Sequence, residues 1–161
     1  MQFRSSISSR ILEAQSKCLV RVLLVMARDA HHDAVRRALE KEGWTITDDP
    51  FLISVGRGNL QIDLGAERLM AAERESERIA VEIKVFGAVS LVNAFHLALG
   101  QILNYRINLE DLEPDRQLFL AVPESVFNSF FQTELVQKAI SRLHIAVLVF
   151  DPETEVIVKW C

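Results

Sequence analysis

The sequence has too few cysteines to form a disulfide framework. Among its 161 residues only Cys18 and Cys161 are cysteines, and two thiols exclude both a disulfide-rich secreted domain and a zinc site made of four cysteines. We therefore expect a protein of the reducing cytoplasm. Glycine (6) and proline (4) are also scarce, while half of the residues are hydrophobic and a quarter are charged. This balance excludes collagen-like and disordered chains.

Long hydrophobic runs are missing as well. The best candidate, Cys18 to Ala27, is interrupted by Arg21, whereas a membrane-spanning helix needs roughly 18 to 20 apolar residues. A membrane span is therefore excluded. The length of the chain favours a single hydrophobic core.

Charge is distributed unevenly along the chain. Residues 1–25 contain four basic residues and one acid, which gives them a charge of +3. Because the net charge of the whole chain is −4, residues 26–161 carry a charge of −7. We expect residues 1–25 to be an N-terminal extension, either upstream of the true start at Met26 or a targeting segment, and residues 26–161 to form one domain. An acidic domain lacks the broad basic surface of a tight non-specific DNA binder.

Hydrophobic periodicity predicts an α/β domain. The expected helices cover Ala30–Glu42, Val89–Leu109 and Glu124–Leu143. The expected strands include Leu60–Leu64, Leu69–Ala72 and Arg78–Phe86 as a meander, then Gln117–Val122, Ile145–Phe150 and Glu155–Trp160. The near-continuous apolar run of Gln117–Val122 is typical of a strand buried on both faces, which implies a parallel partner. The expected order is α-β-β-β-α-β-α-β-β, with the helix after the meander as the crossover.

Three polar residues of the meander are candidates for a catalytic site. Alternation along Arg78–Phe86 places Glu82 and Lys84 on one face, and the eighteen residues between Asp63 and Glu82 allow a hairpin that brings these acids together. Two carboxylates can hold Mg²⁺ or Mn²⁺, and a nearby lysine can orient a metal-bound water. This pattern indicates phosphodiester hydrolysis. The alternative is a solvated Glu-x-Lys face of a half-exposed strand.

Gln101 and Tyr105 lie four residues apart on the expected crossover helix. This spacing places both on one helix face, where an amide and a phenol could contact a DNA backbone or position the site. The alternative is a surface glutamine beside a tyrosine packed on the sheet.

The order of these elements resembles the PD-(D/E)xK nuclease superfamily, with Ile62-Asp63 in place of the leading Pro-Asp. From Met26 to Trp160 the chain looks like the XisH family, the excision-controlling proteins of the cyanobacterial fdxN element. The segments that carry the resemblance are Lys41–Thr47, Ile62–Glu67, Ile79–Lys84, Ala98–Gln101, Asn104–Arg106, Asp151–Glu153 and Glu155–Trp160.

The resemblance implies a restriction-endonuclease-like mixed sheet flanked by helices and a role in DNA rearrangement during heterocyst differentiation. It makes Asp63 and Glu82 the metal ligands, Lys84 the water-orienting residue, and Gln101 with Tyr105 the supporting pair. His32 or Asp33 could supply a further group from the first helix, or could be capping or solvated residues.

The partners that the resemblance implies are DNA, a site-specific recombinase and a small XisI-type protein, with a homodimer left open. We therefore expect an excision-controlling factor with a Mg²⁺-dependent nuclease-like site. The alternative is a non-catalytic adaptor that uses the same fold to bind a partner protein or DNA.

Overall fold

The computed structural model describes residues 16–17, 19–20, 26, 30–69, 76–86 and 90–161. Most of the expected N-terminal extension, residues 1–25, lies outside the described residues, as do residues 70–72 of the strand expected over Leu69–Ala72. After the helical residues 30–41, the elements are β1 (Thr45–Asp48), β2 (Phe51–Val55), β3 (Gly58–Ile62), β4 (Leu64–Leu69), β5 (Ser76–Ile83), α2 (Leu91–Leu112), β6 (Arg116–Pro123), α3 (Glu124–Asn128), the 3₁₀ helix η1 (Phe130–Gln132), α4 (Glu134–Leu143), β7 (Ala146–Asp151) and β8 (Val156–Trp160).

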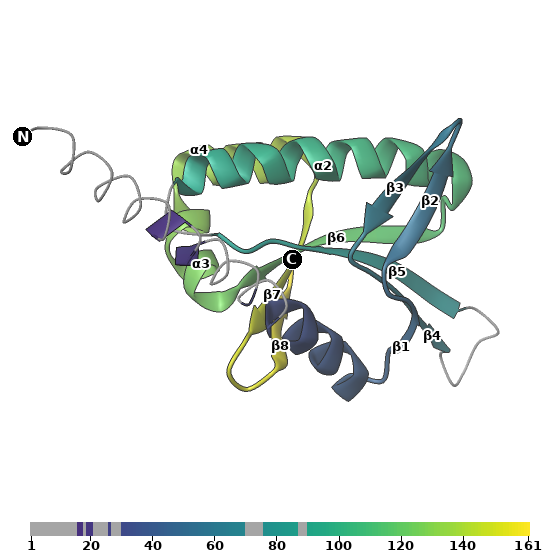
Figure 1. Ribbon diagram of the computed structural model, residues 1–161, viewed down its shortest axis with the longest axis horizontal. Coiled ribbons are helices and arrows are strands. Elements are labelled where there is room, and N and C mark those ends of the chain that lie inside the picture. Colours follow the sequence, from purple (N-terminus) through teal and green to yellow (C-terminus); the bar gives the residue numbers. More distant parts are fainter. Residues whose placement is uncertain (1–15, 18, 21–25, 27–29, 70–75, 87–89) are drawn as a thin grey trace, which may run out of the picture.

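A six-stranded mixed sheet with the order β1-β4-β5-β6-β7-β8 forms the centre of the domain (Figure 1). β6 is parallel to both β5 and β7, and the other neighbouring pairs are antiparallel. The side chains of Leu120, Ala121 and Val122 in β6 are fully buried, as expected for a strand with a covered sheet on both sides. The predictions of a mixed α/β fold, a buried parallel strand and a crossover helix are confirmed.

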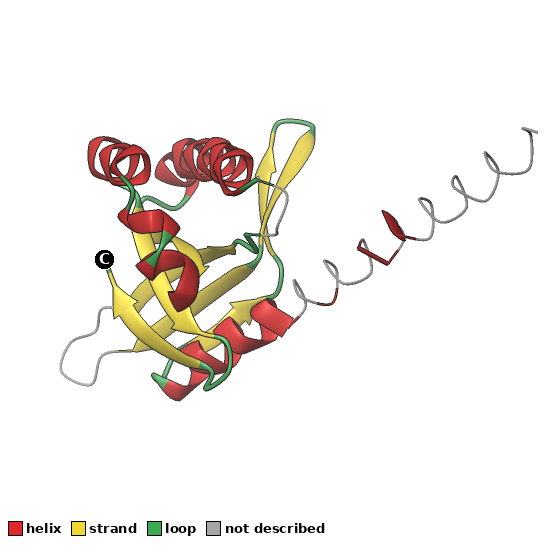
Figure 2. Ribbon diagram, turned by 90° about the vertical axis from the view of Figure 1, so that its left-hand side faces the viewer, coloured by secondary structure: helices red, strands yellow, loops and turns green. Residues whose placement is uncertain are grey.

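Helices cover both faces of this sheet, as Figure 2 shows. The helix of residues 30–41 places Val35 and Leu39 against Val81 and Phe119. On the other face, α2 packs against the sheet through one buried stripe, and its members are Phe95, Ala98, Ile102, Tyr105 and Leu109. The fold therefore has three layers. Among the described residues, no helix is long and apolar enough to cross a membrane.

Local sequence signals mark the C-terminal end of the helix of residues 30–41 and the N-terminal end of α2. Gly43 has a φ of +87° and follows the helix of residues 30–41, a conformation that glycine adopts without steric cost. Ser90 is the N-cap of α2, since its Oγ accepts a hydrogen bond from the amide of Asn93 at 3.2 Å. Such a cap satisfies one of the amide groups that the first turn leaves without a helical partner.

The structure differs from the expected meander at β3. β2 and β3 form a separate two-stranded ribbon, and Asp63 lies between β3 and β4 rather than inside one strand. The ribbon turns away from the sheet because its apolar face, which includes Phe51 and Ile62, packs against Tyr105 and Leu109 of α2. The order of elements is otherwise close to the prediction, with the expected helix Glu124–Leu143 divided into α3, η1 and α4.

The packing of α2 can be tested with two isoleucines of that helix. Ile102 is 2 % exposed and Ile107 is 62 % exposed. Ile102→Ala should lower the free energy of unfolding by about 2–5 kcal/mol because it leaves a cavity under the helix. Ile107→Ala, the matched control, should change it by no more than about 0.5 kcal/mol. Urea unfolding measures both, and equal effects would contradict the buried face assigned to α2.

Candidate active site

Asp63 stands where the chain leaves the β2–β3 ribbon and enters the central sheet. Its side chain is 8 % exposed, and its Oδ2 accepts a hydrogen bond from the backbone amide of Ile83 at 2.8 Å. This bond ties the junction between β3 and β4 to the carboxyl end of β5. The position of Asp63 beside Glu82, predicted from their spacing, follows from this bond.

Glu82 and Lys84 extend from the carboxyl end of β5 toward α2. Glu82 is 3 % exposed, and its Oε1 lies 2.6 Å from Lys84 Nζ. The amide of Lys84 donates to the carbonyl of Ala121 at 3.1 Å, which continues the β5–β6 ladder beyond Ile83. The prediction that Glu82 and Lys84 share one face is confirmed, but the glutamate is buried rather than solvated.

The second oxygen of the Glu82 carboxylate is in an unusual position. Glu82 Oε2 is buried and has no hydrogen-bond partner among the described residues. A buried oxygen of this kind costs free energy unless a proton or a cation compensates it. Lys84 therefore pairs with one oxygen of this carboxylate, and the charge at Oε2 is not compensated by a hydrogen bond within the described structure.

Burial and a like charge both act on this carboxyl group. Burial raises the pKa of Glu82 above its usual value, and the negative charge of Asp63 raises this pKa further. The ammonium group of Lys84, through its charge and its hydrogen bond, opposes both effects and lowers the pKa of Glu82, and a backbone hydrogen bond from Asp63 lowers this pKa as well. Two carboxylates that repel each other at a buried position form a site that favours a cation.

A cavity of about 530 Å³ joins these groups to α2. It is lined by all five residues predicted as catalytic, namely Asp63, Glu82, Lys84, Gln101 and Tyr105. Tyr105 is 7 % exposed, and it packs on the sheet while also lining the cavity. The packing of this tyrosine on the sheet is therefore observed, and its role in the site stays a prediction.

Three further lining residues were not predicted. Gln61, Ile83 and Val85 also line the cavity. The alternation of residues 60–64 places Gln61 on the same side as Asp63, so this signal was present in the sequence. The place of Gln61 in the cavity depends on the packing of the β2–β3 ribbon against α2, and no local sequence pattern specifies this packing.

The first helix does not contribute to this cavity. His32 Nε2 lies 2.9 Å from Asp49 Oδ1, and the side chain of Asp33 is 59 % exposed. Neither residue lines the cavity, because their helix covers the opposite face of the sheet (Figure 1). The sequence left open whether His32 and Asp33 belong to the site or are capping or solvated residues. The structure favours the second role for both.

The donor set fits a hard divalent cation with few protein ligands. Among the described residues, no group of three or more His, Cys, Asp or Glu side chains is placed to hold a metal ion. Mg²⁺ needs only one or two carboxylates, because water and substrate phosphate fill its other positions. Asp63 and Glu82 meet this requirement, and the buried Glu82 Oε2 is the oxygen that such an ion would compensate.

Comparison with known proteins gives a consistent family match. The family model of XisH proteins matches residues 25–158. A solved XisH family protein from Nostoc punctiforme PCC 73102 is 44 % identical, with a TM-score of 0.73 over 81 % of this chain and 98 % of that chain. A solved fdxN element excision controlling factor protein from Anabaena variabilis is 46 % identical, with a TM-score of 0.74 over 83 % of this chain and 98 % of that chain. No curated protein matches the chain.

The electrostatic arrangement of the site predicts opposite effects of two substitutions on Glu82. Asp63→Asn removes a like charge, so the pKa of the Glu82 carboxyl should fall. Lys84→Met removes a favourable charge, so this pKa should rise. NMR titration of the side-chain carboxyl carbon measures both, with Asp33→Asn on the opposite face as the control. An unchanged pKa in Asp63→Asn would contradict the close approach of the two acids.

Proposed function

This chain belongs to the XisH family, and from this premise we propose that it is an excision-controlling factor whose cavity hydrolyses DNA phosphodiesters with a bound Mg²⁺ or Mn²⁺. The proposal places the chain in the PD-(D/E)xK superfamily, with a restriction-endonuclease-like sheet. Asp63 and Glu82 are the metal ligands, and Lys84 is the residue that orients water.

One observation carries the proposal. Residues from three separate parts of the fold, the β3–β4 junction, the end of β5 and the middle of α2, converge on one cavity. A chance group of surface charges does not bury a carboxylate to 3 % exposure beside a second acid and a lysine. Perturbed carboxyl groups of this kind gather at functional sites.

The side chains divide the chemistry among themselves. A divalent ion between Asp63 and Glu82 would supply a water of lowered pKa and neutralise charge on the scissile phosphate. Lys84 Nζ, held at 2.6 Å from Glu82 Oε1, keeps a positive charge beside the water and offsets negative charge that develops on the phosphate. Gln101 and Tyr105 hold the DNA backbone from the α2 side through hydrogen bonds.

The same proposal assigns the biological setting. The solved protein from Anabaena variabilis is an fdxN element excision controlling factor, and we propose the same role for this chain. Its partners would then be DNA, a site-specific recombinase and a small XisI-type protein, in the cytoplasm of a cyanobacterium.

A second candidate function is a non-catalytic adaptor. The net charge of −4 favours it, because an acidic protein gains little from counterion release on DNA. An adaptor would use the same fold to bind a partner protein or DNA without cutting it. The two functions differ in whether the cavity binds a metal ion and hydrolyses DNA.

Metal binding is the first test. Mg²⁺ at ten times its Kd should stabilise the wild-type protein by about 1.4 kcal/mol, and EDTA should remove the effect. Asp63→Asn combined with Glu82→Gln should abolish it, because neutral amides no longer compensate the ion. The control is Asp33→Asn combined with Glu134→Gln, two exposed acids outside the cavity. Thermal unfolding measures the shift, and an equal shift in the Asp63/Glu82 variant would remove this site from consideration.

A substitution of Lys84 distinguishes the proposed nuclease from the proposed adaptor. Lys84→Ala should abolish metal-dependent DNA cleavage but retain metal-induced stabilisation, because the lysine is not a ligand. Lys138→Ala, an exposed lysine of α4, should cleave like the wild type. The assay uses single-stranded, duplex and branched DNA at low salt, since an acidic protein binds DNA weakly at physiological ionic strength. No cleavage of any substrate by the wild type, together with a retained XisI-type complex, would favour the adaptor.

A further inference from the structure

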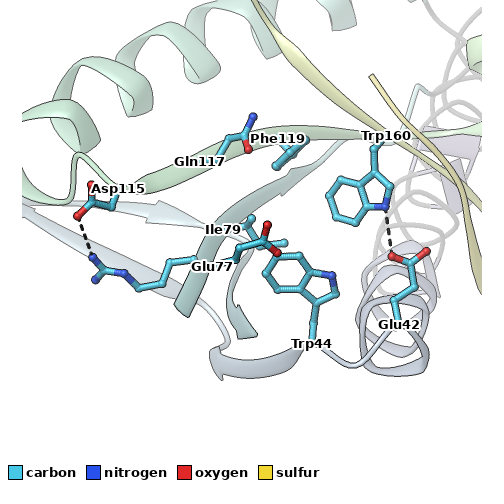
Figure 3. A pocket seen from close by; sticks show the side chains of 9 residues that line it. Glu42, Trp44, Glu77, Ile79, Asp115, Gln117, Phe119 and Trp160 are labelled. Carbon is cyan, nitrogen blue, oxygen red and sulfur yellow. Dashed lines mark hydrogen bonds and ion pairs between the residues drawn. The ribbon is translucent and has the colours of Figure 1, made fainter. Parts of the chain in front are cut away.

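Figure 3 shows a second cavity, which is lined in part by Trp44, Ile79 and Phe119. These residues pack with the helix of residues 30–41, so the cavity lies on the face of the sheet opposite the candidate active site. Its volume is about 310 Å³. It opens at the starts of β5 and β6, where Ile79 pairs with Gln117, whereas Glu82 and Lys84 lie at the far end of β5. The helix of residues 30–41 ends before the turn at Gly43 and leaves this part of the sheet uncovered. The exposed side chain of Gln117 shows this.

The cavity has an aromatic wall that is held in place. Trp160 contacts Phe119 edge to face, with ring centroids 4.9 Å apart, and lies 6.0 Å from Trp44. The indole Nε1 of Trp160 donates a hydrogen bond to Glu42 Oε2 at 3.2 Å. All three rings line the cavity (Figure 3). Packed aromatic rings of this kind offer a ligand rigid π surfaces.

The rim of the cavity is negatively charged. Among the described residues that line the cavity, Glu42, Glu77 and Asp115 supply three carboxylates and Arg78 supplies one guanidinium group. Arg78 is already engaged, since its Nη1 lies 3.2 Å from Glu113 Oε2 and its Nη2 lies 3.8 Å from Asp115 Oδ2. Aromatic rings and carboxylates in one cavity both attract a cation, whereas the phosphate groups of a nucleic acid would meet like charge.

We propose that this cavity binds an arginine side chain presented by a basic partner protein. A guanidinium group is planar, stacks on aromatic rings and forms paired hydrogen bonds with carboxylates, so it matches both the wall and the rim. The volume is at the lower end of the range of roughly 300–1,000 Å³ for ligand pockets, which suits one side chain rather than a large ligand. A partner bound here leaves the cavity of Asp63 and Glu82 accessible on the other face.

Tryptophan fluorescence tests the proposal directly, because the chain contains only two tryptophans and both line this cavity. Titration with the peptide acetyl-Gly-Arg-Gly-amide should give a saturable change in emission. The citrulline peptide, a neutral analogue of the same shape, and a duplex oligonucleotide should give none. Lys84→Ala should bind the arginine peptide like the wild type, so failure of the nuclease proposal does not affect this result. An equal response to citrulline, no response to arginine, or a saturable response to the oligonucleotide would overturn the proposal.

Variants of the rim identify the binding site. Glu77→Gln and Asp115→Asn should each raise the Kd of the arginine peptide by about 1.5- to 5-fold, the range for exposed ion pairs. Glu134→Gln on α4, also an exposed glutamate, should leave the Kd unchanged. The two indole N–H signals in a ¹H–¹⁵N NMR spectrum provide a measurement that needs no variant, because both should shift with arginine. Unchanged indole signals, or rim variants that bind like the wild type, would place the peptide elsewhere and overturn the proposal.

Discussion

The candidate active site depends on the burial of one carboxylate, that of Glu82 at the carboxyl end of β5. An ionised group in this position requires compensation, and the described structure supplies part of it, through Lys84 Nζ at 2.6 Å and a backbone hydrogen bond from Asp63. The other oxygen has no hydrogen-bond partner among the described residues. Asp63, whose charge raises the pKa of Glu82, makes this imbalance larger. The arrangement costs stability unless a proton or a cation joins it, which is typical of a site built for binding rather than for stability.

The surrounding fold maintains this arrangement from both sides. The hydrogen bond from the amide of Ile83 to Asp63 holds the β3–β4 junction against β5. The ribbon of β2 and β3 packs on α2 through Phe51 and Tyr105, so the helix that covers the sheet also closes the cavity. A change in the packing of α2 would therefore alter the relative positions of Gln101, Tyr105 and the two acids.

The two cavities have different chemistry and lie on opposite faces of the same sheet. The cavity of Asp63 and Glu82 combines two acids, a lysine, two amides and a phenol, which suits a metal ion and a phosphate. The cavity of Trp44 and Trp160 combines aromatic rings with a carboxylate rim, which suits a cationic side chain. The proposed nuclease and partner-binding functions could thus operate on one domain without competing for surface.

Local patterns in the sequence determined which residues share a face. Alternation placed Glu82 with Lys84, helical spacing placed Gln101 with Tyr105, and a continuous apolar run identified β6 as a buried parallel strand. Only the tertiary structure decided which faces meet. It turned the β2–β3 ribbon onto α2, added Gln61 to the cavity, and paired His32 with Asp49 away from it. It also brought Trp44 and Trp160 together from opposite ends of the domain. The reason is physical, since periodicity follows from the backbone geometry of a single element, whereas the meeting of elements depends on how all their apolar faces are buried at once.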